Sequence, residues 1–213
     1  MAEWSDHVYA GTRRQLHGLA EGLIAGPQYR SAGTIRLTVL PDGFSGTAVP
    51  MSVRGLELVW PDATMPLAGT PRELAEAAGV DFGPPVGVYR SDATLTADAV
   101  LDIDAAAAQV LTRCLHAGHR ALRRVFPTQH PVLWPEHFDV AVTEGSVNYG
   151  VSAGDGYHGA PYAYVGPWEP RTGAFWNAPF GAVYPLDRDR DGEQLTADIA
   201  AFFERGSSEL SGS

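Results

Sequence analysis

The sequence predicts an α+β protein of one domain, with an antiparallel sheet flanked by a long core helix and three shorter helices. Short segments with alternating apolar residues indicate strands, and segments with apolar residues every three or four positions indicate helices. At 213 residues and 45% apolar composition the chain can bury one sizeable core, and no repeat or linker divides it. We therefore expect a single domain over residues 1–206 and a disordered tail over 207–213.

The first part of the chain predicts one helix followed by a meander. Apolar residues at helical spacing indicate an amphipathic helix over residues 8–24 that ends at Gly26-Pro27. Alternating apolar residues then indicate strands over 34–40, 47–53 and 56–60. Because turn residues separate these strands, we expect them to pair antiparallel as a meander.

A short helix and two extended segments are expected next. Thr70 and Glu73 have the spacing of a capping box, with a proline in the first turn, and Gly79 is placed to end the helix. The segments 80–89 and 95–103 are expected to be extended.

The longest helix is expected to begin after the N-cap Asp104 and to run over residues 105–126. Its apolar residues repeat every seven positions, which is typical of a helix that packs in the core. A closing helix is expected over 195–206, with Gly206 as its terminator.

The C-terminal half is rich in aromatic residues. Eleven of the 21 aromatic residues lie between His130 and Pro185, and residues 134–152 predict a hairpin that turns at Glu144-Gly145. Pairing Val142 with Val147 gives an apolar face, which we assign to the core: Phe138, Val140, Val142, Val147, Tyr149 and Val151. The opposite face then receives polar and small residues: His137, Asp139, Ala141, Asn148, Gly150 and Ser152.

Two interpretations of the polar face remain open, either a surface that meets solvent or the floor of a small-molecule pocket. In the second, His137 is an acid, base or ligand and Asp139 orients it. The other ligand contacts would come from Asn148, Ser152, Tyr162, Tyr164 and Trp168. The alternative function is a non-catalytic interaction or dimerisation domain that uses exposed aromatic residues. An enclosed polar face favours a pocket, and a flat one with exposed Trp and Tyr favours an interface.

Two groups of residues are candidate metal ligands, although the linear spacing does not enforce the first. Asp155 and His158 can join His137 and Asp139 as a histidine and carboxylate set. A second group has the spacing of a calcium loop: Asp187, Asp189, Asp191 and Asp198. The final Asp in place of Glu, and Arg188 and Arg190 within the loop, favour instead an acidic turn that caps the last helix.

Other candidate motifs favour structural roles. Residues 150–154 match Gly-x-Ser-x-Gly around Ser152, but an antiparallel hairpin with no helix after it disfavours a serine nucleophile. His116 and His119 lie on the core helix and are interpreted as structural or exposed. Cys114 is the only cysteine, which excludes an intrachain disulfide, and is interpreted as a buried inert thiol.

The charge and composition narrow the classes of partner. The net charge is −10 and all fifteen basic residues are arginine, so a nucleic-acid-binding surface is disfavoured. No signal-peptide pattern and no apolar run of 18 residues occurs, which predicts a cytoplasmic protein without a membrane partner. A small-molecule ligand and a homo-oligomer remain the expected partners, and no cofactor is indicated.

Short motifs along the chain are similar to a bacterial family of domains of unknown function. They are GTIRL at 33–37, VRGL at 53–56, HPV at 130–132, FDVAV at 138–142 and YAY at 162–164. The family has a GKIRL-like strand, an ARGL-like strand end, an FDLAV-like motif and a YAYAYPEP-like strand, in the same order. The chain departs from it at 165–170, which reads VGPWEP. The resemblance implies a bacterial protein and supplies no activity.

Overall fold

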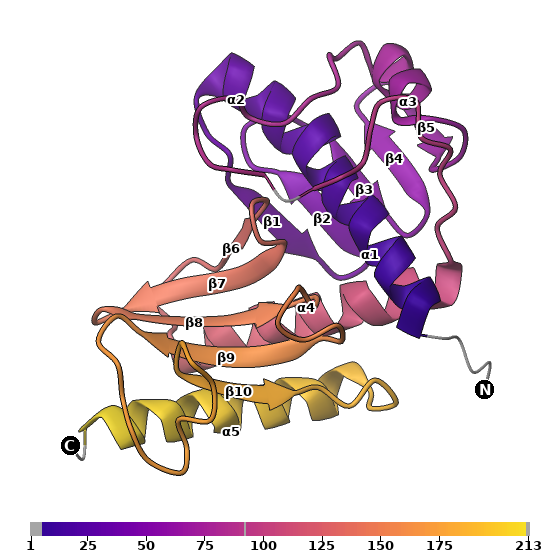
Figure 1. The fold of residues 1–213 in the computed structure, drawn as a ribbon. Coiled ribbons are helices and arrows are strands. Elements are labelled where there is room, and N and C mark those ends of the chain that lie inside the picture. Colours follow the sequence, from indigo (N-terminus) through magenta and orange to yellow (C-terminus); the bar gives the residue numbers. More distant parts are fainter. Residues whose placement is uncertain (1–5, 92, 212–213) are drawn as a thin grey trace. The chain divides into compact units, whose positions relative to one another are not determined.

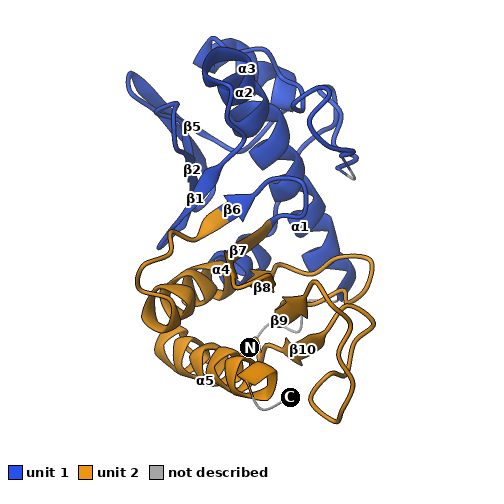
Figure 2. Ribbon diagram, turned by 90° about the vertical axis from the view of Figure 1, so that its left-hand side faces the viewer, with its two compact units in different colours: residues 1–112, 133–138 blue, residues 113–132, 139–213 orange. Residues whose placement is uncertain are grey.

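The computed structural model describes residues 6–91 and 93–211, and the chain divides into two compact units (Figure 2). Unit 1 comprises residues 1–112 and 133–138, and unit 2 comprises residues 113–132 and 139–213. Each unit combines antiparallel strands with helices, which confirms the α+β prediction. The single domain over residues 1–206 stays a prediction.

Unit 1 begins with one continuous helix (Figure 1) made of α1 (Asp6–Leu19), the π-helical turn η1 (Ala20–Ala25) and α2 (Gly26–Ala32). The predicted end of this helix at Gly26-Pro27 was wrong. A proline inside an α-helix normally removes one backbone hydrogen bond and clashes with the preceding turn. Here a π-helical turn immediately precedes it, and the helix continues to Ala32, where Gly33 ends it in the left-handed conformation (φ 69°).

The π-helical turn leaves one carbonyl for a partner outside the helix. The Gly26 N–H donates to the carbonyl of Glu21, five residues earlier. In the same pattern the carbonyl of Gly22 would pair with Pro27, which has no N–H. The Gly83 N–H donates to Gly22 O instead, at 3.0 Å. The proline is therefore accommodated because another segment of unit 1 supplies the missing donor.

Three glycines spaced four residues apart form a glycine face on this helix: Gly18, Gly22 and Gly26. A Cβ atom at these positions would lie within 2.3 Å of the Leu95 and Phe82 side chains and of the Gly83 carbonyl oxygen. The irregular segment 80–103 therefore packs directly against the helix backbone. The two extended segments expected there contain no strand among the described residues.

The strands of unit 1 are β1 (Leu37–Leu40), β2 (Gly43–Gly46), β3 (Ser52–Arg54), β4 (Glu57–Trp60) and β5 (Ala63–Pro66), with residues 133 and 134 of β6 (Val132–Trp134). They pair antiparallel in the order β6-β1-β2-β3-β4-β5. The predicted antiparallel meander is confirmed, but β2 and β5 were not expected, and β1 pairs with β2 rather than with the strand expected over 47–53. The strand expected over 47–53 was wrong in its first half, because residues 47–50 form a bend between β2 and β3.

Gln28 ties the helix to this sheet. Its side chain is fully buried and makes four hydrogen bonds. Nε2 donates to the carbonyls of Thr34 and Arg36, at 3.1 and 2.8 Å, and Oε1 accepts from the N–H groups of Thr47 and Ala48, at 2.7 and 2.8 Å. A buried amide with all of its partners fixes the end of α2 against the start of the meander.

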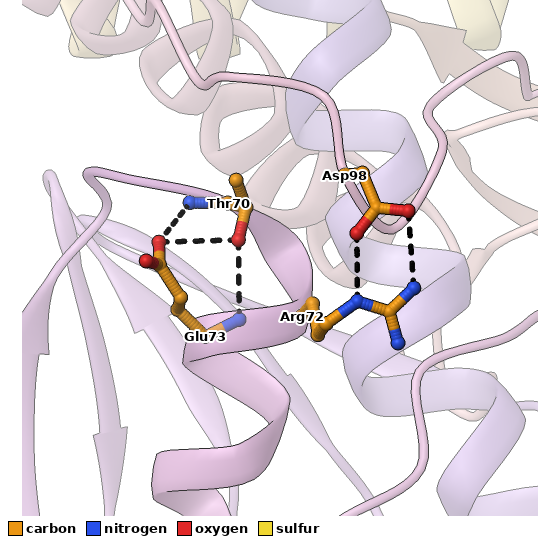
Figure 3. Close-up of polar contacts among 4 residues, drawn as sticks. All are labelled: Thr70, Arg72, Glu73 and Asp98. Carbon is orange, nitrogen blue, oxygen red and sulfur yellow. Dashed lines mark hydrogen bonds and ion pairs between the residues drawn. The ribbon is translucent and has the colours of Figure 1, made fainter.

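The short helix α3 (Pro71–Ala78) forms as predicted (Figure 3). The Thr70 hydroxyl accepts from the Glu73 N–H, and Glu73 Oε2 accepts from the Thr70 N–H at 2.8 Å. Gly79 ends the helix in the left-handed conformation, with φ 67°. Arg72 pairs with Asp98 through two hydrogen bonds of 2.7 and 3.0 Å, which attaches the segment after the helix to its first turn.

Unit 2 contains β7 (Asp139–Glu144), β8 (Val147–Ser152), β9 (Tyr162–Pro167), β10 (Ala182–Pro185) and α5 (Gly192–Ser211), with residues 113–125 of α4 (Ala105–Val125). The strands pair antiparallel in the order β7-β8-β9-β10. One face of the sheet packs against the helices at two glycines, Gly118 against Val151 and Gly206 against Val165. The core assignment is confirmed, since six side chains expected in the core are at most 6% exposed: Phe138, Val140, Val142, Val147, Tyr149 and Val151.

The hairpin between β7 and β8 has a different register from the predicted one. Val142 lies opposite Tyr149 rather than opposite Val147, a shift of two residues. Because side chains alternate with a period of two, this shift leaves every residue within β7 and β8 on its predicted face. The turn is the pair Gly145-Ser146, with φ values of 55° and 64°, as a two-residue type I′ hairpin requires.

The last helix is longer than predicted. Gly206 does not terminate α5 but lies inside it, where a Cβ atom would be 2.8 Å from a methyl group of Val165. The helix continues to Ser211, so residues 207–211 are helical where a disordered tail was expected. The Ser207 and Tyr149 hydroxyls lie 3.1 Å apart and attach this end of the helix to β8. No helix within residues 6–91 and 93–211 is long and apolar enough to cross a membrane.

Candidate functional site

His137 and Asp139, the predicted pair, lie in different local structure, one before strand β7 and the other inside it. Asp139 is the first residue of β7 and is 5% exposed. His137 precedes the strand and is largely exposed, with its Nε2 3.6 Å from Glu136 Oε1. Between them, Phe138 has a left-handed backbone with φ 51°, so the strand alternation that was expected to carry His137 onto the face of Asp139 ends there. The role of His137 as acid, base or ligand stays a prediction.

Asp139 binds a tyrosine from two strands away. The Tyr164 hydroxyl, on β9, donates a hydrogen bond to Asp139 Oδ2. To reach β7, the Tyr164 ring lies over Gly150 of the intervening strand, where a Cβ atom would be 2.5 Å from the phenol carbon Cζ. A glycine at this position is therefore required for the contact. It lies on the sheet face turned away from α4 and α5, opposite Tyr164 in the register.

A second tyrosine and carboxylate pair lies beside the first. The Tyr162 hydroxyl donates to Asp155 Oδ2 at 2.5 Å, and Asp155 Oδ1 accepts from the backbone N–H groups of Tyr157 and His158, at 2.8 and 3.0 Å. Ser152 lies opposite Tyr162 in the register and is 3% exposed. Asp155 thus orders the loop after β8 and orients the phenol at the same time.

Both phenols stay protonated well beyond neutral pH. Burial, together with the charge of Asp139 and the hydrogen bond to it, raises the pKa of Tyr164 well above its usual value. Burial, the hydrogen bond to Asp155 and its charge likewise raise the pKa of Tyr162. Each hydroxyl therefore stays a neutral donor to its carboxyl partner.

Four aromatic rings and an imidazole continue from these pairs toward solvent. The ring centroids of Tyr162 and Tyr164 are 6.3 Å apart, and Tyr157 and His158 approach Tyr162 to 6.2 and 5.8 Å. Phe180 lies 5.0 Å from Tyr157. Tyr157 is 48% exposed and Phe180 40%. We call this group the tyrosine–carboxylate cluster: Asp139, Ser152, Asp155, Tyr157, His158, Tyr162, Tyr164 and Phe180.

The predicted ligand residues divide between the two ends of the strands. Ser152, Tyr162 and Tyr164 lie in the cluster. Asn148 lies four residues from Ser152, about 13 Å along the strand, and its Oδ1 accepts from Thr143 Oγ1 at 2.8 Å. Trp168 lies at that same end, where its backbone N–H donates to the Ser146 carbonyl. Asn148 and Trp168 therefore belong to the hairpin turn and not to the cluster.

Neither predicted metal set is assembled. Among the residues that the structure describes, no three His, Cys, Asp or Glu side chains are grouped as a metal ion requires. Asp155 is bound within its own loop, and His158 Nδ1 lies 2.8 Å from the Ala160 carbonyl. In the acidic segment Asp191 Oδ1 accepts from the Gln194 N–H at 2.9 Å and caps α5. The acidic groups around it are held by other contacts: Asp187 by the Asp189 N–H and Arg190, and Asp198 by Arg190.

Of the residues assigned structural roles in α4, Cys114 is buried, and His116 and His119 are half-buried. Cys114 is completely buried, and burial raises the pKa of its thiol to about 12. Burial also lowers the pKa of His119, and the neighbouring His116 and Arg123 lower it further, so this imidazole is neutral at physiological pH. Both observations agree with an unreactive position on the core helix.

Sequence reasoning missed three features near or outside this cluster. Tyr157 and Phe180 were not singled out, because ring contacts between two loops leave no periodic signal. In unit 1, Glu21 is 2% exposed inside the π-helical turn, and its Oε2 accepts from the Ser91 hydroxyl at 2.6 Å. The signal for Glu21 was present as a single carboxylate in the apolar run LAEGLIAG.

Comparison of the chain with protein-family models, with curated proteins and with solved structures finds no match. The similarity to a bacterial family of domains of unknown function therefore stays a prediction.

Proposed function

We propose that unit 2 binds a small molecule at the tyrosine–carboxylate cluster. The observation that supports it is the pair of tyrosine–carboxylate hydrogen bonds on the sheet face opposite α4 and α5. The other face already supplies the core, so these polar groups are not needed to pack the helices. Polar groups that converge among aromatic rings are typical of ligand sites.

Burial distinguishes this face from an ordinary solvated sheet surface. Asp139, Ser152 and Tyr162 are at most 5% exposed, whereas Tyr157 and Phe180 are more than a third exposed. Burying a carboxylate is costly unless hydrogen bonds satisfy it, and Tyr164 supplies such a bond to Asp139. A ligand would meet the exposed rings first and the fixed phenols beneath them.

The roles proposed for the residues follow from their contacts. Asp139 and Asp155 hold the phenols in place, and the rings of Tyr157 and Phe180 form the walls. Ser152 Oγ accepts from the Gly154 N–H at 3.0 Å, which gives the hydroxyl a structural partner in the loop. The proposal is binding, and no catalytic role is assigned.

NMR titration of the full chain with four small probes of different chemistry tests the proposal. The probes are choline, acetate, glucose and phenol, and the readout is the shift of assigned backbone amides. We expect at least one probe to shift amides of residues 150–164 and Tyr157→Ala to weaken that response. Tyr184→Ala is the matched control, because Tyr184 is 37% exposed in the same unit but stacks on Phe202. If no probe shifts these amides, or if both variants respond like the wild type, the proposal fails.

A second candidate function is self-association through exposed aromatic residues of unit 2. Trp168 is 67% exposed, and rings exposed to this degree are typical of association surfaces. Light scattering across a range of protein concentrations tests it. A dimer that Trp168→Ser dissociates supports this candidate, and a monomer at every concentration contradicts it.

A further inference from the structure

Three hydroxyl groups of the tyrosine–carboxylate cluster, those of Ser152, Tyr162 and Tyr164, have used their hydrogen-bond donors. Tyr162 and Tyr164 each have one O–H, and each donates it to a carboxylate. The Ser152 hydroxyl hydrogen-bonds the Tyr162 phenol. His158 Nδ1 faces the Ala160 carbonyl, which can only accept, so Nδ1 carries a proton and uses it there.

Apart from the exposed Tyr157 hydroxyl, the groups that remain are acceptors. They comprise the Asp155 carboxylate and the phenol oxygens of Tyr162 and Tyr164. From Asp139 to Phe180 the sequence contains one basic residue, Arg171, and the chain contains no lysine. A ligand that fits these groups must bring donors or positive charge, whereas an anion would meet carboxylates.

The faces of the aromatic rings, like the acceptor groups, favour a positively charged ligand. Tyr157 contacts Phe180 at an interplanar angle of 75° and Tyr162 at 62°. Tyr157 and Phe180 contact each other edge to face, and both keep exposed ring surface. Aromatic faces are electron-rich and attract ammonium groups by cation–π attraction.

We infer that the cluster binds a small organic cation, with its ammonium group against the Tyr157 and Phe180 rings and beside the Asp155 carboxylate. This inference rests on the proposed function and names the ligand class of that site. The cation enters from the exposed side, where Tyr157 and Phe180 have free ring surface. Tyr162, held by Asp155, supplies a further ring edge and keeps the carboxylate aligned.

Choline and its neutral carbon isostere 3,3-dimethylbutan-1-ol separate charge from shape. They have the same size and differ in the charge of the quaternary centre. In NMR titrations of the full chain we expect choline to bind about tenfold more tightly than the isostere. Tyr157→Ala is expected to weaken choline binding about tenfold, and Tyr184→Ala to leave it unchanged. Choline binding is also expected to weaken as salt is added.

The outcomes distinguish the ligand class from the binding function. If the isostere, phenol, glucose or acetate shifts the same amides as tightly as choline, the cation inference is wrong and small-molecule binding stands. If choline binds equally well to wild type and Tyr157→Ala, its site lies elsewhere and the inference is also wrong. If no probe shifts residues 150–164, both proposals fail together.

Discussion

Replacing Gly26 by Ala tests whether segment 80–103 depends on the glycine face of the N-terminal helix. Gly26 has helical dihedral angles, φ −64° and ψ −55°, so alanine fits the backbone. The added Cβ would lie 1.8 Å from the Gly83 carbonyl oxygen. This oxygen belongs to the backbone and also accepts from Arg30 at 3.3 Å, so no side-chain rotation relieves the overlap.

The expected magnitude follows from three contributions. Alanine in place of glycine within a helix stabilises by about 1 kcal/mol. Overlap with Gly83 costs about 1–3 kcal/mol. Displacing Gly83 also breaks its hydrogen bond to the Gly22 carbonyl, which contributes about 1 kcal/mol. The sum is a destabilisation of Gly26→Ala by about 1–3 kcal/mol.

Gly11→Ala is the matched control, because Gly11 lies in α1 of the same helix and has no atom within 4 Å of its ideal Cβ. This variant is expected to be more stable than wild type by about 1 kcal/mol. The two variants should therefore differ by roughly 2–4 kcal/mol in the free energy of unfolding, or roughly 4–16 °C in Tm for a chain of this length.

Urea unfolding followed by circular dichroism measures the difference, and limited proteolysis locates it. We expect faster cleavage within residues 80–103 in Gly26→Ala than in Gly11→Ala. Equal stability of the two variants, with equal cleavage rates, would refute the close packing of this segment on the helix.

Three further predictions concern unit 2. Ser146 has a left-handed backbone, so Ser146→Gly is expected to raise the free energy of unfolding by about 0.5–1 kcal/mol. A lower free energy of unfolding in urea for this variant would contradict the type I′ turn. The Cys114 thiol, with its pKa raised to about 12, should resist iodoacetamide at pH 8 in the native protein and react after unfolding. The raised pKa of Tyr162 stabilises the folded state fully below the unfolded pKa of about 10, and this contribution should decline as the pH rises above that value. Tyr162→Phe should therefore lose stability less steeply than wild type above pH 10 in urea midpoints; equal slopes would argue against the burial of this phenol.

Local signals predicted several elements of the fold well. The capping box at Thr70 and Glu73 depends on neighbouring residues only, so sequence was sufficient. The hairpin faces were also predictable, because alternation survives a two-residue error in register. The register itself was missed, since it depends on Ser146 adopting a left-handed conformation, which serine seldom does.

Features that depend on distant residues were not predictable in the same way. Pro27 signalled the end of a helix, and nothing near it in the sequence indicates that Gly83 supplies the missing donor. In the candidate site, strand alternation predicted that Tyr162 and Tyr164 share a face. The partners of these tyrosines could not be predicted, because Asp155 depends on a loop conformation and Asp139 on a glycine that lets one ring cross a strand.

The π-helical turn also changes the direction in which side chains project from the N-terminal helix, so that α1 and α2 do not follow one regular α-helical spacing. Five-residue spacing places one more residue in a turn than the α-helix does, which amounts to about 100° of rotation around the axis. Residues after Ala25, Gln28 among them, therefore project in directions that the spacing of α1 alone does not give. Removal of a single residue between Ala20 and Ala25 would restore uniform α-helical winding and leave Gln28 at nearly the same angle around the axis, because the wide turn absorbs one extra residue. The turn thus holds one residue more than an α-helix would need, while the Gln28 amide keeps its four backbone partners.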